Sequence, residues 1–330
     1  MNLVTGATGH IGNVLVRKLL DAGQSVRAFV LPGEDTLALR DLPAEQVPGD
    51  VLDPSSLRRA MRGVTKVFHL AGIISILPGR NDLLRRVNVE GTKNILAEAR
   101  RSGVERLIYT SSIHAIQRAP QGVCIDERLP FDPQNPVGEY DRSKAEASLA
   151  VQQAMLEGLN SVIVCPTGVI GPNDYRHSEL GQLILDCMEE KTQFYVDGAY
   201  DFVDVRDVAD GMLLAAEKGR TGETYILSGQ QLAVRNIIDI LWEMTGKRFN
   251  RIHIPFSLAK AASAFTPIYY RLSGAKPRFT PYSLATLRSN SDISHEKASR
   301  ELGYRPRNLM ETLADTVDWF QRNQREAAPA

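Results

Sequence analysis

Leu3-Val4-Thr5-Gly6-Ala7-Thr8-Gly9-His10-Ile11-Gly12 places three glycines between a short apolar run and the amphipathic run Ile11–Ala22. A strand, a glycine-rich turn and a helix in this order predict a dinucleotide-binding loop. Side chains at the crowded positions would block the sharp turn or the close approach of a pyrophosphate. The helix start offers free N–H groups and a positive dipole end to the phosphates. The cofactor-binding candidates in this loop are Gly6, Thr8, Gly9, His10, Ile11 and Gly12, and an ordinary tight turn is the structural alternative.

Composition restricts the class of protein. The 330 residues carry 39 Lys and Arg against 39 Asp and Glu, so no net charge attracts nucleic acid. Three widely spaced cysteines, Cys124, Cys165 and Cys187, predict neither a disulfide framework nor a zinc site, and we expect no metal. The glycine loop begins too early for a targeting peptide, and no apolar run reaches the roughly 20 residues of a membrane span. We therefore expect a cytoplasmic protein without a membrane span.

The first half alternates β-branched runs with amphipathic runs, which is typical of βαβ units and a parallel sheet. The predicted strands are Asn2–Thr5, Ser25–Leu31, Lys66–Leu70, Arg106–Thr110, Asn160–Cys165, Asp201–Asp204 and Thr224–Ile226. The predicted helices are Ile11–Ala22, Ser55–Arg62, Asn88–Ser102 and Arg142–Glu157, with Gly23 and Gly103 at C-termini and Asp53 near an N-cap. The fold class is α/β, a Rossmann doubly wound parallel sheet with a smaller, mostly C-terminal substrate lobe.

The expected Rossmann domain covers residues 1–165, and residues 200–228 return to it with two strands near Phe202 and Tyr225. Residues 166–199 and 229–330 form the substrate lobe. Within this lobe, Lys276–Asn290 is the longest stretch without clear periodicity.

Tyr140 and Lys144 are four residues apart in a predicted helix, so both can project along one face. A phenol has a pKa near 10, and a neighbouring ammonium favours the phenolate. The pair therefore suits acid–base chemistry on a carbonyl or alcohol, although a pair on the helix surface is the alternative. Thr110-Ser111-Ser112 ends a strand at the carboxyl edge where doubly wound sheets bind ligands. A serine hydroxyl there can hold a substrate oxygen against the tyrosine, or cap the next segment.

Asp50 and Val51 follow the second βα unit. A carboxylate at this position can accept a hydrogen bond from an adenine amino group while Val51 packs on the ring. A turn or N-cap aspartate is the equally weighted alternative.

These elements together resemble the extended short-chain dehydrogenase/reductase superfamily, that is, the NAD-dependent epimerase/dehydratase family, over almost the whole chain. The segments that carry the resemblance are Thr5–Gly12, Gly49-Asp50, His69–Gly72, Asn88–Thr92, Tyr109–Ser112, Tyr140–Lys144, Pro166–Pro172 and Asp204–Ala209. The resemblance implies that Tyr140 is the general acid/base and that Lys144 binds the nicotinamide ribose and lowers the tyrosine pKa. It places the serine at Ser112, with Ser111 as the second choice.

The same resemblance implies further cofactor contacts. Gly6, Gly9 and Gly12 would line the pyrophosphate, Asp50 and Val51 the adenine, Ala71 the nicotinamide ribose and Pro166 the nicotinamide. Asn88 would be structural. A homodimer through helices near 90–102 and 142–157 is expected from the family.

The cofactor is expected to be NAD or NADP. Enzymes that use NADP typically carry an arginine just after the second strand, but this chain continues Leu31-Pro32-Gly33. Glu34 and Asp35 come slightly late for the acid that binds the ribose 2′-hydroxyl. With no cation at this position, a 2′-phosphate would lack its partner, so the pattern leans to NAD. The lean is slight because Arg27 and Arg40 can still approach the phosphate.

Pro166-Thr167 and Gly171-Pro172 resemble the dihydroflavonol-reductase and 3β-hydroxysteroid-dehydrogenase branch, together with bacterial hopanoid-associated "sugar epimerase" proteins. The predicted function is interconversion of a secondary alcohol and a carbonyl on a small, fairly apolar substrate. The alternatives are a nucleotide-sugar epimerase or dehydratase with tightly bound NAD, and a non-catalytic dinucleotide-binding protein. Aromatic residues of the lobe form either an apolar substrate pocket or ordinary packing; they are Phe256, Phe265, Tyr269, Tyr270, Phe279 and Tyr282.

Overall fold

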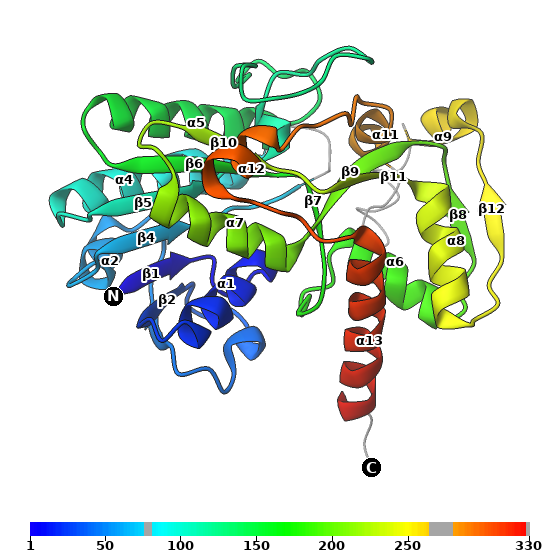
Figure 1. Ribbon diagram of the computed structural model, residues 1–330, viewed down its shortest axis with the longest axis horizontal. Helices are drawn as coiled ribbons and strands as arrows, with labels where there is room; N and C mark the ends of the chain where they lie inside the picture. The colour runs from blue at the N-terminus through cyan, green and yellow to red at the C-terminus, as the bar shows by residue number, and fades with distance from the viewer. Residues whose placement is uncertain (76–80, 264–279, 328–330) are drawn as a thin grey trace.

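The computed structural model describes residues 1–75, 81–263 and 280–327, without the side chains of 324–327 (Figure 1). The strands are β1 (Asn2–Thr5), β2 (Val26–Val30), β3 (Glu45–Pro48), β4 (Lys66–His69), β5 (Arg106–Thr110), β6 (Ser161–Pro166), β7 (Gly168–Ile170), β8 (Gln193–Tyr195), β9 (Ala199–Asp204), β10 (Thr224–Leu227), β11 (Gln230–Ala233) and β12 (Arg251–His253). The helices are α1 (His10–Asp21), α2 (Pro54–Ala60), α3 (Asp82–Arg85), α4 (Thr92–Arg101), α5 (Glu139–Leu156), α6 (Glu179–Met188), α7 (Val205–Lys218), α8 (Val234–Thr245), α9 (Phe256–Ser263), α11 (Pro281–Leu287), α12 (Glu296–Leu302) and α13 (Leu309–Ala327). Short 3₁₀ turns lie at η1 (Leu37–Leu39) and η3 (Ile113–Ala115), and the π-helical turn η2 (Arg86–Gly91) precedes α4.

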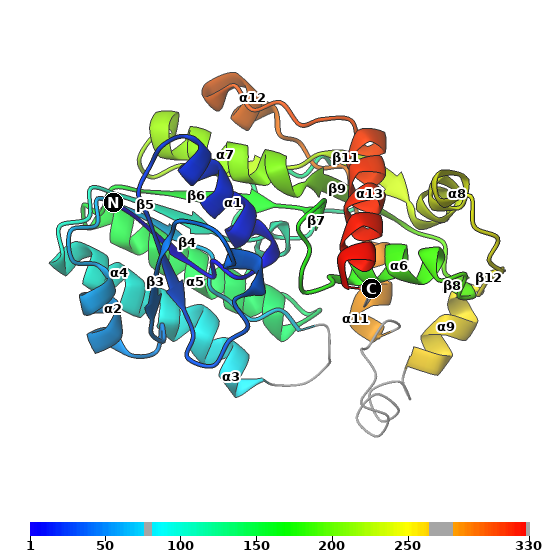
Figure 2. The same ribbon diagram turned by 90° about the horizontal axis from the view of Figure 1, so that it is seen from below.

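Seven parallel strands in the order β10-β6-β5-β4-β1-β2-β3 form the main sheet. One face is covered by α1, α7 and α12, and the other by α2, α4 and α5 (Figure 2). Side chains buried on both faces explain why the central strands are continuous apolar runs. The predicted Rossmann-type α/β fold is confirmed.

A second lobe lies beside this sheet (Figures 1 and 2). It contains the three-stranded sheet β11-β9-β7 and the two-stranded sheet β12-β8. Its core joins α6, α8 and α13 through buried apolar side chains such as Ile184, Leu241 and Phe320. No helix in the described part of the chain combines the length and the apolar character needed to cross a membrane.

Two sequence predictions differ from the structure in this region. β10, with Tyr225, does join the main sheet, but β9, with Phe202, pairs with β7 and β11 in the lobe. The stretch Lys276–Asn290, predicted to lack periodicity, contains α11, which begins with Pro281 after a Thr280–Ser283 capping box. The division of the chain into a Rossmann domain and a substrate lobe remains our proposal.

The sequence prediction also omitted β3, which is a short, mostly exposed edge strand ending in Val47 and Pro48. Such a strand gives no hydrophobic alternation, and proline is tolerated only because the edge needs no further donor. All three cysteines are free, Cys124 at the surface and the other two buried.

Asp204 connects the main domain to the C-terminal helix. Its buried carboxylate caps the start of α7 by accepting from the N–H of Arg206, at 2.7 Å, and it accepts from the hydroxyl of Thr312 in α13, at 2.8 Å. Burial acts to raise the pKa of Asp204, but hydrogen bonds and charge from Arg206 outweigh it and hold the pKa below its ordinary value. The stabilisation is therefore present above the unfolded pKa and is lost as the pH falls through the folded one.

We expect Asp204→Ala to lower the free energy of unfolding by about 3 kcal/mol, because the helix cap and the buried acceptor of the Thr312 hydroxyl are lost together and Arg206 is left with its pair with Asp315. Urea denaturation at pH 7 measures this loss. Asp318→Ala is the control, since its pair with Arg322 is exposed and should contribute less than about 0.5 kcal/mol. Equal stability losses in the two variants would contradict the proposed role of Asp204.

Candidate active site

The glycine loop connects β1 to α1, and two glycines are required by its geometry. Gly6 has φ +68°, and a Cβ there would lie 2.8 Å from the amide nitrogen of Ala71. A Cβ on Gly12 would lie 2.1 Å from the carbonyl oxygen of Gly6. The loop therefore lies directly on the end of β4, and α1 lies directly on the loop. The remaining space and the N–H groups at the start of α1 fit a dinucleotide pyrophosphate.

The other loop residues contact a distant segment, which follows β7. His10 Nε2 lies 3.0 Å from the carbonyl oxygen of Pro172, and the hydroxyl of Thr8 accepts from Arg176 at 2.9 Å. Asn13, which the sequence reasoning did not single out, donates to the carbonyl oxygens of Gly9 and Asn173 at 2.9 and 3.1 Å. Gly9 lies in the turn itself, with its N–H donating to Gly6, and Ile11 packs against the core between α1 and the sheet.

The predicted adenine and ribose contacts lie at the same edge of the sheet. One carboxylate oxygen of Asp50 accepts from the N–H of Leu52 at 2.8 Å, so Asp50 makes the turn contact that was the structural alternative. Val51 is buried and its side chain lies where a Cβ on Gly91 would be, which brings α4 close to this turn. Ala71, just after β4, donates its N–H to the hydroxyl of Thr5 at 3.2 Å. Whether Asp50, Val51 and Ala71 contact a cofactor remains a proposal.

Helix α5 carries Tyr140 and Lys144 to the carboxyl end of β5. Lys144 is buried, its Nζ donates to the carbonyl oxygen of Thr110 at 2.6 Å, and it lies 4.8 Å from the ring centroid of Tyr109. Burial lowers the pKa of Lys144 to about 8. The ammonium is therefore mostly protonated at neutral pH and close to its titration point.

Ser111 and Ser112 have different surroundings. Ser111 is buried against Ser148 of α5, with 2.6 Å between the hydroxyl oxygens, so it fastens the helix to the strand end. Ser112 caps η3 by accepting from the N–H of His114 at 3.2 Å, and its hydroxyl acts to lower the pKa of the Tyr140 phenol. The geometry therefore favours Ser112 over Ser111 as the partner of the tyrosine.

In the protein without a bound cofactor, the Tyr140 phenol is protonated at neutral pH. Burial raises the pKa of its phenol to about 12, the Ser112 hydroxyl acts against this rise, and the neighbouring Asp141 carboxylate adds to it. Since Lys144 donates to Thr110, the lysine does not by itself bring the tyrosine pKa down as the sequence reasoning expected. The lowering of this pKa stays a prediction for the state in which a cationic nicotinamide is also present.

A group of aromatic and charged side chains surrounds Tyr140, and of these only Tyr282 was singled out from the sequence. The ring of His114 lies 6.3 Å from that of Tyr140 and stacks on Tyr200 at 5.7 Å, with Nε2 2.7 Å from the Tyr200 hydroxyl. Tyr282 donates to the buried Asp141 at 2.6 Å. Burial lowers the pKa of His114, so its ring is neutral near pH 7. Tyr200 and Tyr282 come from β9 and α11 of the lobe, so the lobe closes over the tyrosine.

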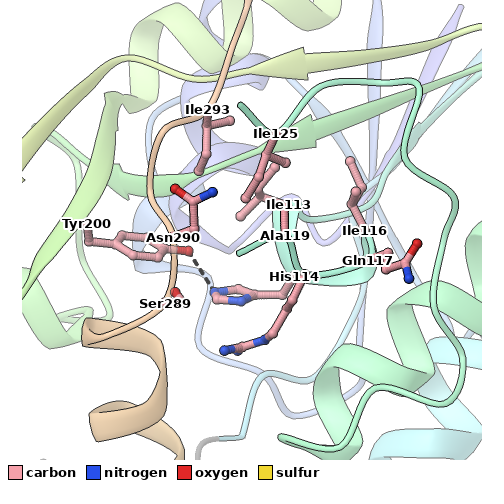
Figure 3. A pocket seen from close by; sticks show the side chains of 11 residues that line it. Ile113, His114, Ile116, Gln117, Ala119, Ile125, Tyr200, Ser289, Asn290 and Ile293 are labelled. Carbon is pink, nitrogen blue, oxygen red and sulfur yellow. Dashed lines mark hydrogen bonds between the residues drawn. The ribbon is translucent and has the colours of Figure 1, made fainter. Parts of the chain in front are cut away.

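A small cavity of about 30 Å³ lies beside His114 and Tyr200 (Figure 3). Its lining is mixed, and Gln117, Arg118 and Ser289 contribute to the polar part. The walls also include the apolar side chains of Ile113, Ile116 and Ile293 and the polar side chain of Asn290. The side chains of these residues point into one space between η3 and the segment after α11 (Figure 3). The cavity therefore extends the surroundings of Tyr140 towards the lobe.

Pro166 ends β6 and is buried in register with Leu227. Asn88 lies in the π-helical turn, where its amide bonds both backbone groups of Ile73 and donates to Ser143 of α5 at 3.0 Å. Its contacts are structural, in agreement with the expectation for Asn88.

Of the lobe aromatics, Phe256 lies under the guanidinium of Arg288 at 4.3 Å from the ring centroid. Phe265, Tyr269, Tyr270 and Phe279 fall outside the described residues.

The two arginines proposed to approach a 2′-phosphate are not equivalent. Arg27 donates to the carbonyl oxygens of Ala60 and Arg62 and to Glu45, at the end of β2 away from the glycine loop. Its charge is thus used at the opposite edge of the sheet. Arg40 is exposed after η1.

We expect Gly12→Ala to abolish measurable NADH binding, because the new Cβ cannot coexist with the Gly6 carbonyl and the loop must move. Fluorescence titration with NADH measures the effect. Gly9→Ala is the matched variant, since its Cβ would lie 3.3 Å from the same oxygen and should weaken binding less. Wild-type affinity in Gly12→Ala would show that the loop does not hold the dinucleotide.

Comparisons with known proteins agree with this geometry. The model of the NAD dependent epimerase/dehydratase family matches residues 2–228. Sterol demethylase protein B of Methylococcus capsulatus is 39% identical over 321 residues, covering 97% of this chain and 98% of that protein. A 4-hydroxy-2-methyl-3-oxo-4-farnesyl-3,4-dihydroquinoline-1-oxide ketoreductase of Stigmatella aurantiaca is 32% identical over 333 residues, covering 99% and 96%.

Among solved structures, gox2253 superposes with a TM-score of 0.86 at 33% identity and covers 98% of this chain and 99% of its own. The predicted family, the enzyme class and the nicotinamide dinucleotide cofactor are thereby confirmed. The chain belongs to the NAD dependent epimerase/dehydratase family.

Proposed function

We propose that this enzyme interconverts a secondary alcohol and a ketone, with Tyr140 as the proton-transferring group. The observation that carries the proposal is that α5 places Tyr140 one turn before the buried Lys144, which donates to Thr110 at the end of β5 next to Ser112. This is the sheet edge that holds the glycine loop. The bound dinucleotide supplies the hydride acceptor or donor. Ser112 holds the substrate oxygen by a hydrogen bond, and Lys144 binds the nicotinamide ribose.

The protonation state of Tyr140 in the protein without a cofactor suits reduction better than oxidation. A phenol whose pKa is about 12 retains its proton at neutral pH and can donate it to a carbonyl oxygen as that oxygen gains negative charge. In the oxidation direction the phenol must first lose its proton, which needs the positive charges near it. Asp141 acts against this loss, because its carboxylate raises the pKa of the phenol.

An apolar substrate fits the surroundings of Tyr140 best. Isoleucine side chains form one part of the wall of the cavity next to His114, and polar side chains such as Gln117 and Ser289 form the rest. One relative is named for a sterol and another for reduction of a farnesylated ring ketone, both of which are apolar molecules. These observations support the reductase and dehydrogenase branch for this chain.

Sugar epimerisation is the second candidate, because the family includes epimerases. That reaction returns the hydride to the same substrate, so the dinucleotide stays bound throughout. Mass spectrometry of the purified protein separates the two functions: near-stoichiometric NAD favours the epimerase, and a freely exchanging cofactor favours the dehydrogenase.

We also propose that the enzyme is a homodimer through α4 and α5. The outer face of α5 leaves Leu149 39% and Leu156 84% exposed. Large apolar side chains exposed on one helix favour a contact with a second copy.

Tyr140→Phe should lower kcat by about 10²- to 10⁴-fold, since it removes the proton but keeps the ring. NADH affinity should stay within about threefold of wild type. Turnover across a panel of apolar ketones and alcohols, with NADH titration alongside, measures both. Tyr195→Phe in β8 is the control and should keep full activity. Retained turnover in Tyr140→Phe would remove the proposed chemistry.

The two reaction directions should respond oppositely to pH. Oxidation requires the Tyr140 phenolate, so kcat/KM for the alcohol should rise with pH between 6 and about 8. Reduction requires the protonated phenol and the Lys144 ammonium, so kcat/KM for the ketone should fall above about pH 8, where Lys144 loses its proton. Profiles with the same slope in both directions would contradict these roles.

A further inference from the structure

The segment between β7 and α6 lies against the glycine loop (Figures 1 and 2). Three contacts fasten it there, from Pro172 to His10, from Asn173 to Asn13 and from Arg176 to Thr8. The partners in each pair are at least 160 residues apart in the chain. This segment of the lobe therefore forms part of the wall of the dinucleotide site.

Arg176 makes a second contact, with Glu34. Its Nη2 lies 2.9 Å from the hydroxyl of Thr8 and also donates to one carboxylate oxygen of Glu34. The other carboxylate oxygen of Glu34 faces the N–H of Leu31, the first residue after β2. The carboxylate is thus turned back towards the end of β2, and the guanidinium of Arg176 bridges it to Thr8 of the glycine loop.

This position has a defined meaning in a Rossmann domain. An acid at the end of the second strand accepts from the adenosine ribose 2′-hydroxyl, and a cation there accommodates a 2′-phosphate. Glu34, which comes late in the sequence, reaches the position through the turn after β2. Arg176 reaches it from the lobe.

We propose that Glu34 and Arg176 form one cofactor-selecting pair at the adenosine ribose. This inference rests on the proposed dinucleotide-dependent function. Glu34 accepts the ribose hydroxyl and holds Arg176 by its charge. With the guanidinium neutralised by Glu34, a 2′-phosphate meets a carboxylate instead of a free cation, so NAD is preferred over NADP.

Substitution of Glu34 and substitution of Arg176 should change NADPH affinity in opposite directions. Loss of the Glu34 charge leaves Arg176 next to Thr8 with no carboxylate partner at this position, and guanidinium groups bind phosphate well through paired donors. Loss of Arg176 leaves the Glu34 carboxylate uncompensated and makes the site more repellent to phosphate. Glu34 of this ion pair thus binds the ribose hydroxyl, and Arg176 can bind a 2′-phosphate once the Glu34 charge is removed.

Fluorescence titration with NADH and NADPH tests the pair, because the two ligands differ only by the 2′-phosphate. Glu34→Gln should raise NADPH affinity relative to NADH by about tenfold or more. The double variant Glu34→Gln/Arg176→Ala should lose that gain. Arg176→Ala alone should bind NADPH more weakly than wild type. Glu45→Gln, which touches Arg27 at the other end of β2, is the matched control and should leave the ratio unchanged.

An unchanged ratio in Glu34→Gln would overturn the inference, and so would a gain that persists without Arg176. The proposed function fails separately, by absence of NADH binding in the wild type or by retained turnover in Tyr140→Phe. Binding of NADH with an unaltered NADPH ratio would therefore reject only the selecting pair.

Discussion

Burial of a lysine ammonium is unfavourable unless its charge is hydrogen-bonded, and Lys144 meets this requirement through the carbonyl oxygen of Thr110, 2.6 Å away. One turn further along α5, Ser148 contacts Ser111 at 2.6 Å. One turn before Lys144 stands Tyr140. A helix held to a strand end at two successive turns has a fixed rotation, so the position of Tyr140 at the carboxyl end of β5 is fixed as well. The candidate chemistry depends on these contacts between α5 and the end of β5.

The residues predicted from sequence share one property, which is that a local rule requires them. Gly6 has a left-handed φ, and Gly12 has no space for a Cβ, so both positions demand glycine. Asp53 caps α2 through the N–H groups of Ser55 and Ser56. The spacing of Tyr140 and Lys144 has meaning because a helix brings them to one face. Such requirements can be read from a few neighbouring residues.

What the sequence did not predict depends on packing between distant segments. The run at Phe202 has the pattern of a strand, but pattern does not say which sheet receives it, and β9 pairs with β7 and β11. His114 had no motif around it, and it gains its surroundings from Tyr200 and Tyr282 in the lobe. Arg176 is 142 residues from Glu34. No local periodicity connects positions so far apart.

Contacts from the lobe reach both ends of the candidate cofactor site. At the Tyr140 end, Tyr282 donates to Asp141, and the glycine loop at the other end is held by the segment that carries Arg176. A ligand that replaces one of these contacts changes the free energy of lobe packing, because each is a polar contact between the two parts. Polar contacts are exchanged for ligand contacts at less cost than an apolar core is opened. The lobe is therefore joined to the candidate cofactor site by polar groups, which are also the kind of group that binds a dinucleotide or a substrate.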